Sequence, residues 1–139
     1  MATQSQFVST PVIDFASLGT ANTDATSTSG MVTIAGGPTT AAGAGVGKRI
    51  ARVTVAIPGS ASVGTIRFYV SSDSGSTQSI IGELFVPATT GTSTSSMFMA
   101  TVPQLIGLML PGGSGPACLL RAKSTINTGV QVTVESGTF

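Results

Sequence analysis

Short segments in which apolar and polar residues alternate dominate the chain from Met31 onward. Within residues 48–57, every second residue from Val53 to Ile57 is apolar, and Pro58-Gly59 ends the segment. Successive side chains of a strand point to opposite faces, so this period of two predicts a strand with one buried face. Repeated along the chain, the pattern favours an antiparallel β architecture.

Seven such segments follow residue 30, namely residues 31–34, 48–57, 64–71, 79–86, 97–102, 117–123 and 129–135. An N-terminal edge strand would combine Phe7-Val8 with residues 12–15, interrupted at Pro11. No segment has helical periodicity, and residues 104–110 are predicted to be a loop that packs against the core. About eight alternating strands predict an all-β fold, an antiparallel, jelly-roll-like β-sandwich.

The polar composition changes near residue 30 and divides the chain in two. Residues 19–30 are a Thr/Ser/Asn run in which Ala is the only residue suited to a core. We expect residues 1–30 to be an N-terminal arm or edge strand plus a polar linker, and residues 31–139 to be the sandwich domain. The linker is either a loop or an extended arm that reaches a neighbouring subunit.

Most side chains used in catalysis are missing. The chain has no His and one Cys, and charged residues make up 8% of it. Without His there is no Ser-His-Asp triad, and Cys118 is expected to be a buried small hydrophobe. The carboxylates share no spacing motif, although two could converge as a glycosidase-like pair: Asp14, Asp24, Asp73, Glu83 and Glu135. We therefore expect no enzyme, and no catalytic, metal or cofactor-binding residue.

Charge and hydropathy also restrict the partners. A net charge of +1 supplies no basic face for nucleic acid. The longest apolar stretch, residues 105–110, is far shorter than the ~20 residues of a membrane span. Residues 43–48 resemble a phosphate-binding loop, but Ala42 and Arg49 replace its Gly and Ser/Thr, and a strand follows in place of a helix. Neither nucleic acid nor membrane is an expected partner.

Five side chains are candidates for a protein interface. Arg52, Arg67 and Tyr69 lie at polar positions of predicted strands, and Tyr and Arg are typical interface anchors. The alternative for the two arginines is a solvated sheet face or a cross-strand pair with a carboxylate such as Glu83. Met97 and Met99 share one face and serve either in packing or in an apolar subunit contact.

Several short motifs occur in an order that resembles small virion proteins of tailed bacteriophages. They are residues 49–55 (basic-Ile-x-Arg-Val-x-Val), residues 64–70 (Gly-Thr-Ile-Arg-Phe-Tyr-Val), a strand ending at Pro87, residues 119–122 (Leu-Leu-Arg-Ala) and residues 137–139 (Gly-Thr-Phe). The similarity covers residues 20–139. The Gly-Gly-Asp-Phe-like end of that group is matched only in part.

The resemblance implies a capsid decoration (cement) protein on the outside of a phage head, made in the host cytoplasm. The implied partners are the major capsid protein and copies of the chain itself, as a dimer or trimer. A phage tail or baseplate protein is one alternative. A carbohydrate-binding or adhesive β-sandwich is another, which the absence of Trp and the presence of a single Tyr disfavour.

Overall fold

A computed structural model describes residues 10–36, 47–90, 98–112, 116, 118–126 and 129–138 of the chain. These residues form nine strands and one 3-10 turn. The elements are β1 (Thr10–Leu18), β2 (Val32–Gly36), β3 (Lys48–Ile57), β4 (Gly64–Ser71), β5 (Ser79–Val86), β6 (Phe98–Thr101), η1 (Pro103–Leu105), β7 (Met109–Leu110), β8 (Leu119–Ser124) and β9 (Val130–Thr138).

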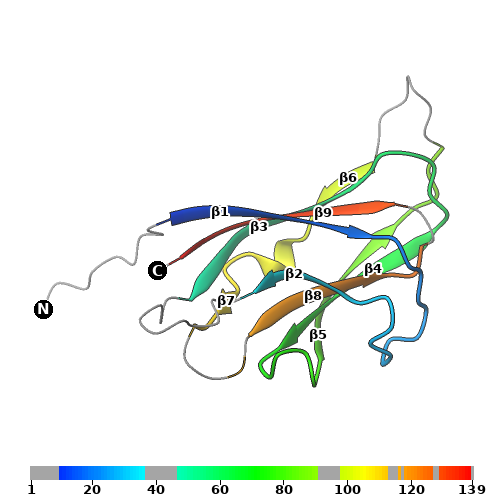
Figure 1. The fold of residues 1–139 in the computed structure, drawn as a ribbon. Helices are drawn as coiled ribbons and strands as arrows, with labels where there is room; N and C mark the ends of the chain where they lie inside the picture. Colours follow the sequence, from blue (N-terminus) through cyan, green and yellow to red (C-terminus); the bar gives the residue numbers. More distant parts are fainter. Residues whose placement is uncertain are drawn as a thin grey trace, which may run out of the picture.

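The strands build two antiparallel sheets that face each other (Figure 1). Sheet A has the order β1-β9-β3-β6, and β7 also pairs with β3. Sheet B has the order β2-β8-β4-β5. The predicted antiparallel β-sandwich is therefore confirmed.

The strand order is that of a long hairpin rolled into a sandwich. The first half of the chain pairs with the second in mirror order: β1 with β9, β2 with β8, β3 with β6 and β4 with β5. Rolling then brings β9 beside β3 and β8 beside β4. Eight strands with this connectivity are a jelly roll, as the sequence predicts.

The core lies between the sheets and consists of the apolar sides of the alternating strands. Val53, Val55 and Ile57 of β3 are fully buried. Val130 and Val134 of the neighbouring strand β9 are also fully buried and belong to the same core. Ile66 and Phe68 of β4 fill the opposite layer. β3, β4 and β9 thus bury the apolar face that their alternation predicts.

The bounds of β3, β4 and β5 equal the predicted ones, whereas other segments differ. Residues 103–110 form η1, a turn and β7, and Leu105 packs into the core as expected of this loop. β9 continues to Thr138, because it pairs with β1 on one side and β3 on the other. Phe7-Val8, residues 43–46 of the segment that resembles a phosphate-binding loop, Met97 and Ala117 lie outside the described residues.

Candidate interaction surface

Arg52 lies on the outer face of sheet A and is paired within the chain. It is opposite Glu135 in the β3–β9 register. Its guanidinium donates two hydrogen bonds to that carboxylate, at 3.1 Å from Nε and 2.5 Å from Nη2. The hydrogen bonds that Arg52 donates to Glu135 raise the pKa of Arg52. The two charges cancel locally, so position 52 contributes a neutral ion pair to this face.

Arg67 lies on the outer face of sheet B and follows the alternative given above, a cross-strand pair. Its Nε donates to Glu83 on β5 at 2.8 Å, in the pairing register of β4 with β5. Its Nη1 donates to the backbone carbonyl of Thr23 at 3.0 Å. Arg67 is therefore bound to two parts of its own chain.

Tyr69 is buried on that same outer face, with 3% of its surface exposed. Its hydroxyl donates to the backbone carbonyl of Ala25 at 2.9 Å, and burial raises its pKa. The amine of Lys123 lies 5.5 Å from the centre of the ring. In this conformation Tyr69 packs within the chain, and its role at an interface with another protein stays a prediction.

The cover over Tyr69 is the polar connection between β1 and β2, residues 19–31, which we call the strap. It runs from sheet A to sheet B along the right of Figure 1. The backbone N–H of Asn22 donates to Ser124 of β8 at 2.8 Å, and Ala21 forms a parallel bridge with the same residue. The strap thereby lies against β8.

Cationic side chains of sheet B hold the strap through its backbone carbonyls. The amine of Lys123 donates to Asp24 and Ser27, the latter at 2.6 Å. Arg121 donates to Met31 at 3.4 Å. Lys123 is 1% exposed, and desolvation lowers its pKa. Alternation places these cations on a polar face, but it gives no sign that a polar linker would cover them.

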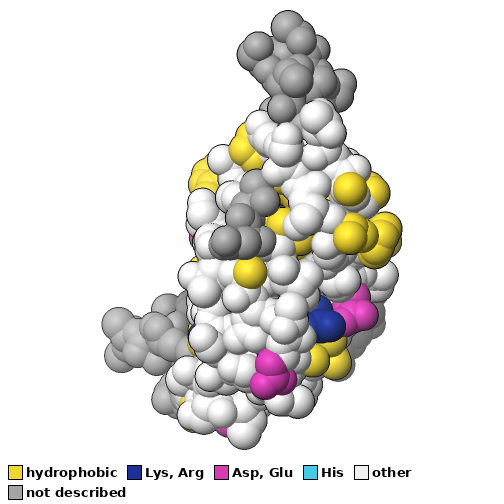
Figure 2. All heavy atoms as spheres, turned by 90° about the vertical axis from the view of Figure 1, so that its right-hand side faces the viewer, with side chains coloured by type: hydrophobic (Ala, Val, Ile, Leu, Met, Phe, Trp, Pro, Cys, Tyr) yellow, Lys and Arg dark blue, Asp and Glu magenta, His cyan; other side chains and the backbone are white. Residues whose placement is uncertain are grey.

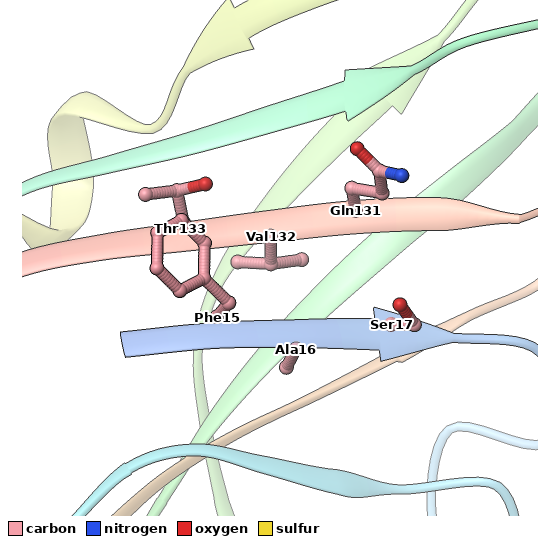
Figure 3. A pocket seen from close by; sticks show the side chains of 6 residues that line it. All are labelled: Phe15, Ala16, Ser17, Gln131, Val132 and Thr133. Carbon is pink, nitrogen blue, oxygen red and sulfur yellow. The ribbon is translucent and has the colours of Figure 1, made fainter. Parts of the chain in front are cut away.

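The outer face of sheet A, in contrast, has no such cover among the described segments. Phe15 of β1 lies opposite Thr133 of β9, and Thr133 lies opposite Thr54 of β3. Figure 3 shows the Phe15 ring reaching from β1 toward Thr133. Phe15 is 77% exposed and its neighbour Ile13 is 58% exposed. The sequence places these residues on an edge strand but does not single them out as an interface.

Met99 is an exposed apolar residue at the opposite edge of this face. It lies on β6, opposite Ala56, and is 62% exposed. Two adjoining depressions that share Thr133 connect the edges. One is lined by Phe15, Ala16, Ser17, Gln131, Val132 and Thr133, and the other by Arg52, Thr54, Met99, Ala100, Thr101, Thr133 and Glu135. We call this combined surface, including Ile13, face A.

Few charges interrupt the exterior. Figure 2 shows one end of the sandwich, where charged side chains are scarce and uncharged atoms cover most of the surface.

Cys118 is buried, as predicted, and burial raises its pKa, which disfavours the reactive thiolate. Across the described ranges, no three His, Cys, Asp or Glu side chains gather as metal ligands. No helix in those ranges is long and apolar enough to cross a membrane.

Comparison with known proteins adds no family. No family model matches the chain, and no curated protein is similar to it.

Proposed function

We propose that the chain is a viral structural protein: a decoration protein that binds the outer surface of a phage head and stabilises contacts between capsomers. The jelly roll is an architecture of viral capsid domains. The motif order of residues 20–139 points to the same class. Because one fold serves many functions, the argument rests on the surface of the molecule.

The observation that carries the proposal is face A. It exposes Phe15, Ile13 and Met99 around a centre of threonines, and its ion pair between Arg52 and Glu135 is satisfied internally. The centres of protein interfaces are poor in charge and rich in aromatic residues and Met. On the outer face of sheet B the strap covers Tyr69 and Lys123, whereas Ile80 and Phe85 of β5 stay exposed. Face A has no such cover among the described segments, so we assign the partner to face A.

A phage head presents many copies of the same binding site, so a protein that makes only weak contacts with each copy can still bind it. A decoration protein needs only weak affinity for each capsomer when linked copies bind together, because the second contact becomes intramolecular. Face A would lie against the major capsid protein, and the protein would be part of the assembled virion.

The proposal is tested by cosedimentation with phage heads that lack the protein, produced from a phage whose copy of the gene is deleted. The wild-type chain should sediment with heads and saturate. Met99→Glu should bind at least about tenfold more weakly, because it places an unpaired charge in a desolvated contact. The matched control is Ile80→Glu on β5 of sheet B, which is 51% exposed and should bind like wild type.

Wild-type protein that sediments no better with heads than in buffer would remove the head assignment. Binding to isolated tails would favour the tail or baseplate alternative. A strong hit on a glycan array would favour a carbohydrate-binding module, since jelly rolls also occur in lectins. The buried position of Tyr69, the one tyrosine of the chain, offers no stacking platform for a sugar in this conformation.

A further inference from the structure

Three of the four sheet edges in the described structure are protected against pairing with another strand. β2 has five residues and an irregular register between Thr33 and Ala35. β6 has four residues. β5 has an irregular register opposite Phe68 and Tyr69 and carries the exposed carboxylate of Glu83. Short strands, bulges and charges are the usual protections of an edge.

β1 is neither short nor bulged, and its one charged residue, Asp14, is paired with Lys48 of β3. Its nine residues pair with β9 in one unbroken register, from Thr10 with Thr138 to Leu18 with Val130. Its Pro11, which weakens an edge as a template, lies near the start of the strand. The other edge of β1 therefore presents a long, regular row of backbone donors and acceptors.

The side chains of β1 suit a partner that is identical to itself. Its outward positions include the exposed Ile13 and Phe15 and carry no charge. Its one charged residue, Asp14, shares the side of the core and accepts a hydrogen bond from Lys48 at 3.3 Å. At a two-fold axis each surface meets its own copy, so a strand whose outward positions are uncharged is compatible with itself, whereas β5 would bring two copies of Glu83 near each other.

We propose that β1 pairs antiparallel with β1 of a second copy, which joins the two sheets A into one continuous sheet. Side chains that lie opposite each other must share a face, which restricts the register. With Phe15 on the two-fold axis, residues 12–18 of each copy pair, Asp14 lies opposite Ala16, and Ile13 lies opposite Ser17. A shift that centres Asp14 would place two carboxylates opposite each other, which is destabilising.

The pairing has a consequence for face A. The two-fold axis between antiparallel neighbours runs perpendicular to the sheet, so the two copies of face A point the same way. A dimer of this kind would present two binding faces to one target surface and gain avidity. This consequence depends on the proposed function, but the dimer itself does not.

The first experiment is sedimentation equilibrium of the whole chain from about 1 µM to about 1 mM. Wild type should dimerise, and Phe15→Glu should raise the dimer dissociation constant roughly 100-fold or more, because one substitution alters both sides of the axis. The matched control is Phe85→Glu on the β5 edge, where Phe85 is 64% exposed, and it should remain dimeric. Circular dichroism should show that both variants are folded, since both positions are exposed.

The second experiment tests the register by oxidative cross-linking in a Cys118→Ala background. Phe15→Cys should form a disulfide-linked dimer, because Cα atoms of opposed residues lie within disulfide range. Ser17→Cys should not, because its own copy lies about four residues further along the paired strand. Monomeric wild type across the concentration range would overturn the proposal. So would dimers that survive Phe15→Glu, or a Ser17→Cys cross-link that exceeds the Phe15→Cys one.

The dimer and the head contact fail separately. Met99 lies on β6, at the far edge of sheet A from β1, so Met99→Glu should dimerise like wild type. A chain that dimerises but does not bind phage heads would contradict the proposed function and leave the dimer proposal standing. A monomer that binds heads refutes the dimer alone.

Discussion

At the scale of the residue, Lys123 shows how this chain uses its few charges. Alternation places it on the outward side of β8, yet it is buried because the strap lies over it. A buried ammonium group is costly unless it is hydrogen-bonded. Here the carbonyls of Asp24 and Ser27 accept its hydrogen bonds, so the lysine fixes a segment that has almost no apolar residues of its own.

Lys123→Met should therefore destabilise the protein by about 1–3 kcal/mol, because the substitution leaves two carbonyl oxygens without their donor. Urea unfolding at neutral pH measures the loss. The control is Arg52→Met, which removes an exposed ion pair and should destabilise the protein clearly less than Lys123→Met does. Equal, small losses in the two variants would mean that Lys123 does not hold the strap.

At the scale of the element, the turn between β4 and β5 is organised by one carboxylate. Asp73 accepts hydrogen bonds from Ser71 Oγ at 2.7 Å and from the hydroxyl of Thr77 at 2.6 Å. The chain reverses at Ser74 and Gly75, with φ of 59° and 93°. The hydrogen bonds from Thr77 are the main reason that the pKa of Asp73 falls to about 2.

This turn should make stability depend on pH at the acid end. A carboxylate whose pKa is lower in the folded state stabilises the fold above its unfolded pKa, 3.8, and this contribution is lost as the pH falls toward 2. Asp73→Asn should remove part of that dependence, seen as a flatter curve of urea midpoint against pH between about 5 and 2. A wild-type curve that parallels the variant's would contradict the role of Asp73.

The elements also show what the sequence can predict. β3, β4 and β5 have their predicted bounds because Pro58-Gly59 and Pro87 end clear alternations. β7 has two residues, too few for a period, and the docking of the strap leaves no periodic signal. The alternation identifies the core-facing side of β3, β4 and β9, and the sequence also predicts an N-terminal edge strand, which β1 is. Only the folded structure shows that the strap covers Tyr69.

In the whole molecule, the first half of the chain pairs with the second half in mirror order. The stretch of chain that connects two paired strands therefore differs greatly in length from pair to pair. The β4–β5 turn spans residues 72–78, whereas the 111 residues 19–129 separate β1 from β9. Each doubling of a loop costs about 0.6 kcal/mol of closure entropy, so closing β1 onto β9 directly costs about 2.4 kcal/mol more than closing the turn. We therefore expect the β4–β5 hairpin and its neighbours to form first, and the β1–β9 pairing to complete the fold.

Folding kinetics can test this order with two conservative core substitutions. Ile66→Val in β4 should slow folding, with a φ-value of about 0.5–0.8, whereas Val132→Ala in β9 should mainly accelerate unfolding, with a φ-value below about 0.3. Both side chains are buried, at 0% and 1% exposure, so each variant should lose enough stability for a reliable ratio. Stopped-flow chevrons in the Phe15→Glu background would keep association out of the rates. A Val132→Ala chain that folds as slowly as the Ile66→Val chain, at matched loss of stability, would place β9 in the nucleus and reverse the expected order.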